Sequence, residues 1–243
     1  MALYGRFSAH QVLPANIHLP MSARAQEVAG HPRPHAGKGS GTAVWLLRHA
    51  EVTPEWQGRV YGGMDIPLSP EGERDSDRMA EVFAREPIVA VYGSPLSRAR
   101  RLAAALARGR GIELIERPGL VEIDRGRWSG MMVDELHARL PDEVKAFHAD
   151  PWSWRAHAGE ADEDVLVRAW PVVDEALRAH AGRTVAIVCH YNVARVILAC
   201  ALDTPPSRSF ELRVEKAHGS LLVDAPAGWR LVHSNVNAPV TVR

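Results

Sequence analysis

The chain has 243 residues, equal numbers of acidic and basic side chains (29 each) and a hydrophobic content of 46%. These values are typical of a globular protein with a sizeable core, and the balanced charge disfavours nucleic-acid or anionic-membrane partners. No stretch approaches a membrane span, and no apolar run resembles a secretory signal. With only Cys189 and Cys200 present, we expect no disulfide framework and a cytoplasmic protein.

Residues 1–42 differ from the rest of the chain. They contain four prolines, four histidines and a glycine-rich run, with no sustained apolar period. This pattern predicts a poorly ordered tail followed by one domain over 43–243. A metal site in the tail is the alternative, but its histidines lack a regular ligand spacing.

From residue 43 onward, short apolar runs alternate with helical stretches, which is typical of βαβ units. We therefore predict a three-layer α/β/α fold with a mostly parallel central sheet. A helical insertion over 131–181, between the third and fourth strands, is expected to act as a lid. The predicted strands cover 43–48, 88–92, 112–115, 184–189, 219–224 and 229–234. The predicted helices cover 70–85, 95–108, 131–139, 142–148, 161–181 and 192–202.

Two of the predicted strands run directly into a histidine. Arg48-His49 follows the first strand, and His190 follows the fourth. Open α/β sheets bind their ligands at the carboxyl ends of the strands, so the two histidines are candidates for one pocket. The alternative is that each histidine only closes its strand by bonding to the backbone.

Two further segments carry candidate chemistry. Ser94-Pro95 follows the second strand at a predicted helix start, where free N–H groups favour an anion and Arg98 can reach the strand ends. In the segment 120–130, Glu122 and Asp124 fall on the same side of an alternating pattern. Either carboxylate can serve as a proton donor or acceptor, or as a surface charge, and the local pattern leaves this open.

Taken in order, these segments resemble the histidine phosphatase superfamily, which is also called phosphoglycerate mutase-like. The resemblance covers about residues 43–235 and is closest to its phosphatase branch, in particular the α-ribazole phosphatases and the broad-specificity phosphatases. The segments that carry it are Arg48-His49, Gly58-Arg59 with 65–72, 94–99, 120–130 and Cys189-His190.

The resemblance implies a role for each residue. His49 is expected to attack phosphorus and carry a phosphohistidine, while Glu122 protonates the leaving oxygen and later activates water. Arg48, Arg98 and a cationic His190 are expected to surround the phosphoryl oxygens. No metal or other cofactor is expected. The predicted substrate contacts are Arg59, Tyr61, Tyr191 and Asn192.

The resemblance thus implies a phosphomonoesterase that acts on a small phosphorylated metabolite. Mutase-type phosphoryl transfer and a non-catalytic phosphate-binding module are the alternatives. The sequence departs from the family pattern in three places. Position 50 is Ala where glycine is usual, so the turn there must accommodate a β-carbon. Pro54-Glu55-Trp56 replaces a stretch that often contains Asn, Tyr191-Asn192 replaces Gly-Gly, and these two changes are expected to narrow or reshape the pocket. Trp152 and Trp154 are expected either to contact the leaving group or to close the core beneath the insertion. The oligomeric state is left open, with a dimer as one option.

Overall fold

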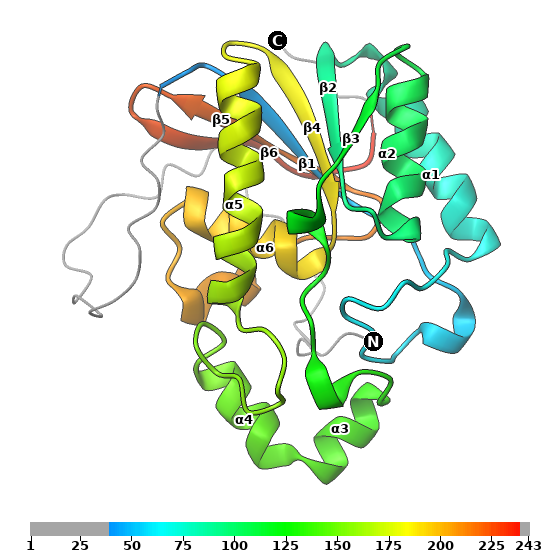
Figure 1. Ribbon diagram of the computed structural model, residues 1–243, viewed down its shortest axis with the longest axis vertical. Coiled ribbons are helices and arrows are strands. Elements are labelled where there is room, and N and C mark those ends of the chain that lie inside the picture. The colour runs from blue at the N-terminus through cyan, green and yellow to red at the C-terminus, as the bar shows by residue number, and fades with distance from the viewer. Residues whose placement is uncertain (1–38, 239–243) are drawn as a thin grey trace.

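The structure is a computed structural model that describes residues 39–238. Its centre is a six-stranded sheet with strand order β3-β2-β4-β1-β5-β6 (Figure 1). The first four strands in this order run parallel, and β5 and β6 pair antiparallel. The predicted α/β class with a mostly parallel sheet is confirmed. The strands are β1 (Ala43–Arg48), β2 (Ile88–Gly93), β3 (Leu114–Glu116), β4 (Thr184–Cys189), β5 (Gly219–Ala225) and β6 (Gly228–Val236).

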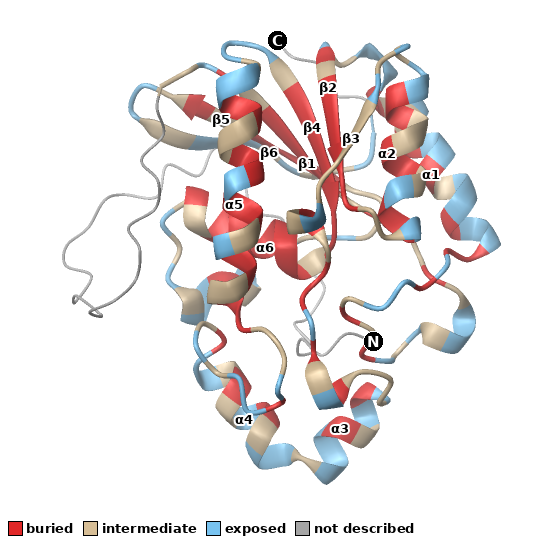
Figure 2. Ribbon diagram, viewed as in Figure 1, coloured by how far each residue is buried: buried red, intermediate tan, exposed pale blue. Residues whose placement is uncertain are grey.

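Helices cover both faces of the sheet, as the predicted three layers require. In β1, Trp45 and Leu47 face one core while Val44 and Leu46 face the other, because successive side chains of a strand point to opposite faces. Figure 2 shows both buried layers as red stripes on the strands and on the inner sides of the helices. On the Trp45 side lie α1 (Pro70–Val82) and α2 (Ser97–Arg108), and on the Val44 side lie α5 (Asp162–Ala179) and α6 (Tyr191–Ala201).

The predicted insertion over 131–181 needs a correction, because α5 is one of the two helices that cover the sheet. Its apolar side is buried in the main core, with Val165, Ala169 and Val173 at 0–1% exposure. The part that stands apart from the sheet is a cap formed by α3 (Val133–Arg139), α4 (Pro141–Ala149) and the loop that follows them (Figure 1).

The cap has a small apolar core of its own. Trp128 is fully buried there and its ring lies 5.0 Å from Trp154 and 5.7 Å from Phe147, measured between centroids. Trp152 packs instead against the main core. Of the two readings of these tryptophans, the structure favours the one in which they close the core.

The start of the domain also differs from the prediction. Residues 39–42, which the sequence places in the tail, are tied to β5. The carboxylate of Asp224 accepts hydrogen bonds from the backbone N–H groups of Gly39 (3.0 Å) and Ser40 (2.9 Å), and Thr42 is fully buried. The rest of the predicted tail, 1–38, lies outside the described residues. Across 39–238, no helix is both long and apolar enough to cross a membrane.

Gly72, in the first turn of α1, lies directly against the segment that follows His49. A Cβ at Gly72 would lie 2.1 Å from the carbonyl oxygen of Glu51, which also accepts a hydrogen bond from Ser69 N–H at 3.0 Å. A side chain at position 72 would therefore push this segment away from α1.

We expect Gly72→Ala to lower the free energy of unfolding by about 2–3 kcal/mol, because backbone must move to relieve the overlap. Thermal unfolding should show a fall in Tm of roughly 5–10 °C. Gly109→Ala is the matched control, since its Cβ would meet nothing closer than 3.4 Å. Equal Tm values for the two variants would contradict the expectation.

Candidate active site

The register of the two central strands brings the two strand-end histidines together. β1 and β4 pair in parallel with Arg48 opposite Cys189, and the N–H of His49 donates to the carbonyl of Cys189 at 3.2 Å. The next residue of each strand is therefore a histidine at the same edge of the sheet. The ring centroids of His49 and His190 are 5.1 Å apart.

His49 is held as a neutral imidazole with a fixed tautomer. Its Nδ1 lies 2.7 Å from the carbonyl oxygen of Ala50, so Nδ1 carries the hydrogen and Nε2 keeps its lone pair. Burial, followed by the charges of Arg98 and Arg48, holds the pKa of His49 well below its usual range. Ala50 is buried and its φ is not positive, so the β-carbon that replaces the usual glycine fits this turn.

His190 has a different set of partners. Its Nε2 lies 2.8 Å from the hydroxyl oxygen of Ser94, and its Nδ1 has no hydrogen-bond partner among the described residues. Burial, Arg98, His49 and Arg48 together hold the pKa of His190 well below its usual range. Burial and the two nearby guanidiniums thus favour a neutral His190 ring in the unliganded protein. The cationic form expected of His190 concerns the phosphate-bound site and stays a prediction.

The charges of the two arginines predicted at the site act on both histidines. Arg98 is fully buried and donates to the carbonyl oxygens of Gly62 (2.7 Å) and Met64 (2.6 Å). Arg48 donates to the carbonyl of Val214 at 2.7 Å. The Nε atoms of both arginines are buried without a partner among the described residues. The loop that contains Gly62 and Met64 thus holds Arg98 in place.

Two of the predicted substrate contacts pack on these arginines. The guanidinium carbon of Arg98 lies 5.2 Å from the ring centroid of Tyr61, and that of Arg48 lies 5.1 Å from the ring of Tyr191. Burial raises the pKa of Tyr61, so its phenol stays protonated. Both rings therefore limit how far the two guanidiniums can move.

Ser94 is a site residue whose role the sequence analysis did not identify. The predicted helix start at Ser94-Pro95 is wrong, since α2 begins at Ser97, where the backbone N–H and the hydroxyl both bond to Asp65 at 2.7 Å. Ser94 is instead the residue after β2, and its hydroxyl contacts His190. Its position at the carboxyl end of a strand was the signal that could have identified it.

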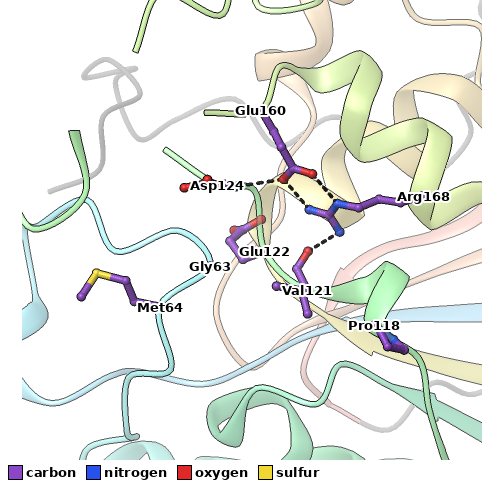
Figure 3. A pocket seen from close by; sticks show the side chains of 8 residues that line it. All are labelled: Gly63, Met64, Pro118, Val121, Glu122, Asp124, Glu160 and Arg168. Atoms are coloured by element: carbon purple, nitrogen blue, oxygen red, sulfur yellow. Dashed lines mark hydrogen bonds and ion pairs between the residues drawn. The ribbon is translucent and has the colours of Figure 1, made fainter. Parts of the chain in front are cut away.

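Glu122 lies between Asn192 and an open cavity. It is 7% exposed, and its Oε2 accepts hydrogen bonds from the backbone N–H (3.2 Å) and side-chain Nδ2 (3.3 Å) of Asn192, two residues after His190. The same side chain lines a cavity of about 580 Å³ (Figure 3). Asn192, predicted to contact substrate, is buried and holds this carboxylate.

One wall of the cavity contains an ion pair. Arg168 on α5 bonds to Glu160 through Nε (2.7 Å) and Nη2 (2.8 Å), and its Nη1 donates to the carbonyls of Gly119 and Val121 (Figure 3). Arg168 is the only cation among the described residues of the lining, and four hydrogen bonds occupy its guanidinium. The lining also includes the carboxylates of Glu122 and Asp124. The lining therefore has an excess of negative charge.

Arg59, the remaining predicted substrate contact, lies away from this group. Its side chain is exposed and donates to the carbonyl oxygens of Glu55 (3.0 Å) and Gly130 (2.9 Å), which ties two loops together. Its contact with substrate stays a prediction. Within residues 39–238, no group of three or more His, Cys, Asp or Glu side chains is arranged to hold a metal ion.

The lowered histidine pKa values can be measured directly by NMR. We expect the ring protons of His49 and His190 not to titrate between about pH 8 and pH 6, because burial and two guanidiniums oppose protonation. Added inorganic phosphate should raise the pKa of His190, since an anion offsets both arginines. Midpoints near the usual 6.5 for both rings of the unliganded protein would contradict this assignment.

Known proteins share both the sequence and the fold of this chain. Phosphoserine phosphatase 1 of Hydrogenobacter thermophilus is 30% identical over 179 residues, which cover 73% of this chain and 84% of that protein. A mycobacterial glucosyl-3-phosphoglycerate phosphatase, solved in complex with VO3, is 26% identical with a TM-score of 0.72 and covers 80% of this chain and 98% of its own.

An Escherichia coli protein to which α-ribazole-5'-P phosphatase activity has been ascribed matches in fold, with a TM-score of 0.74 at 19% identity over 83% of this chain and all of that one. The family model of the histidine phosphatase superfamily (branch 1) matches residues 44–237. Because that match spans the sheet, both histidines and Glu122, the chain belongs to branch 1 of the histidine phosphatase superfamily and is a phosphatase of that type.

Proposed function

We propose that the protein is a cytoplasmic phosphomonoester hydrolase that acts through a phosphohistidine on a small phosphorylated metabolite, without a metal cofactor. The observation that carries this proposal is a neutral, tautomer-fixed His49 that lies beside His190 and within the field of Arg98 and Arg48. A nucleophile needs a free lone pair at neutral pH, and a phosphoryl group needs cations around its oxygens.

In the first step, Nε2 of His49 attacks phosphorus as the bond from phosphorus to the leaving oxygen breaks. Glu122 gives its proton to that oxygen, so the product leaves as an alcohol. In the second step, water attacks the phosphohistidine, Glu122 takes the proton of the water, and the bond between Nε2 and phosphorus breaks. Inorganic phosphate is released and His49 returns to its neutral form.

The cations near the histidines stabilise the phosphoryl group in both steps. Arg48 and Arg98 each have a buried Nε without a partner among the described residues, and His190 has such an Nδ1. These N–H groups suit the phosphoryl oxygens, and a phosphate that carries about −1.5 to −2 charges balances the two guanidiniums. The phosphate would also favour protonation of His190, which then becomes a third cation.

The open cavity supports hydrolysis over mutase-type transfer. A mutase must keep water away from its phosphoenzyme, whereas the cavity of about 580 Å³ reaches Glu122, the group that activates water in the second step. Incubation with 3-phosphoglycerate and 2,3-bisphosphoglycerate tests this choice. Release of phosphate without isomerisation supports the hydrolase, and net isomerisation would overturn it.

His49→Ala should lower the hydrolysis of 4-nitrophenyl phosphate by about 10³-fold or more, because the nucleophile is lost. Wild-type protein quenched during turnover should carry acid-labile, base-stable phosphate that the variant lacks. His137→Ala is the control, since His137 lies exposed on α3. Equal turnover by wild type and His49→Ala would rule out the proposed nucleophile.

The charges on the cavity wall predict a preference among leaving groups. The relatives act, by name, on phosphoserine and on glucosyl-3-phosphoglycerate. Here Arg168 is neutralised by Glu160, while Asp124 adds a negative charge. We therefore expect kcat/KM to be about tenfold higher for phosphoethanolamine than for phosphoglycolate, with glycerol phosphate between them. The reverse order of kcat/KM across a panel of phosphorylated metabolites would show that the charge of the cavity wall does not select the leaving group.

A further inference from the structure

Asn192 sits between the proposed acid and two buried arginines. Its Nδ2 lies 3.3 Å from Oε2 of Glu122, and its Oδ1 accepts from Nη2 of Arg125 (3.0 Å) and Nη2 of Arg195 (3.2 Å). All four side chains are at most 7% exposed. Burial at this level strengthens these bonds relative to bonds made in water.

The chemistry of the two arginines fixes which way the amide points. A guanidinium carries only donors, so the atom of Asn192 that faces Arg125 and Arg195 must be the carbonyl oxygen. The amide nitrogen is then forced toward Glu122. A rotation of the amide would place its N–H groups against two guanidiniums and its oxygen against a carboxylate.

This orientation makes the two oxygens of Glu122 unequal. A carboxylate offers about four lone-pair positions. Oε2 accepts two hydrogen bonds, both from Asn192, while Oε1 accepts one, from the backbone N–H of Ile123 at 2.9 Å. The open position is therefore on Oε1.

We propose that Asn192 is a positioning residue, which occupies Oε2 of Glu122 so that the catalytic proton moves through Oε1. This inference rests on the proposed function, because it assigns Glu122 as the acid. It goes beyond the substrate contact expected for Asn192, since the residue acts through Glu122 and not on the substrate.

The two arginines that orient the amide are themselves held by an ion pair and by two aromatic rings. Arg195 forms a fully buried, two-point ion pair with Asp162 at the start of α5 (2.7 and 2.6 Å). Its guanidinium carbon lies 4.2 Å from the ring centroid of Phe210, and that of Arg125 lies 4.7 Å from the ring of Phe147 on α4. The cap and the segment 206–211 thus brace the two arginines that orient the amide.

Two substitutions separate this role from a purely structural one. Asn192→Asp keeps an oxygen that accepts from both arginines but loses the Nδ2 donor to Glu122. Asn192→Leu has a side chain of similar size but loses the side-chain contacts with both arginines and with Glu122. If Asn192 only holds the arginines, the Asp variant should behave like the wild type. If it positions Glu122, both variants should be impaired in proton donation.

The readout is the dependence of kcat/KM on the leaving group. An alkyl ester such as glycerol 2-phosphate needs its leaving oxygen protonated, whereas 4-nitrophenolate leaves without a proton. We expect both variants to lose at least about tenfold more kcat/KM on the alkyl ester than on the aryl ester. Phe83→Leu is the control, because Phe83 lies in the core on the other face of the sheet. It should change kcat/KM for the two esters by the same factor.

An equal loss on both esters in Asn192→Asp, or no loss on either, would overturn the positioning role. A crystal structure of Asn192→Asp gives a second measurement that does not depend on turnover. We expect the Glu122 carboxylate to leave its present position, and an unchanged Glu122 would also overturn the inference. Failure of the wild type to hydrolyse either ester would instead refute the proposed function.

Discussion

The parallel, in-register pairing of β1 with β4 is the constraint on which the rest of the site depends. It places two histidines, 141 positions apart (190 − 49), at the same edge of the sheet with their rings 5.1 Å apart. A shift of one residue in this register would turn one side chain to the opposite face. The alternating cores on the two faces oppose such a shift, because every buried side chain of the strand would have to move.

The pairing of β1 with β4 creates a buried site with more positive than negative charge around its histidines. Arg98 is fully buried, Arg48 lies beside it, and both histidines are driven to the neutral form. Keeping guanidiniums there without an anion is costly, since their carbonyl partners solvate them only in part. A phosphoryl group supplies the missing charge, so the unliganded geometry is already suited to the charge that develops during transfer.

Glu122, the proposed acid, is held differently, by a chain of hydrogen bonds that runs through Asn192 to two buried arginines. Glu122 is fixed by Asn192, whose amide is oriented by Arg125 and Arg195. Phe147 of the cap packs on Arg125, and Phe210 of the segment 206–211 packs on Arg195. Nucleophile and acid thus rely on different parts of the fold. Changes in the cap should therefore affect proton transfer more than nucleophilic attack.

The sequence by itself determined the α/β class and the strands that end in His49 and His190. It also identified Arg48, Arg98 and Glu122 as candidate site residues. Apolar period, strand length and ordered motifs are local signals, so they can be read along the chain. Only the tertiary structure decided that α5 covers the sheet, that Ser94 contacts His190, and that burial and two guanidiniums lower the pKa of His190. Packing partners, hydrogen-bond partners and pKa values depend on groups distant in sequence, which no local pattern specifies.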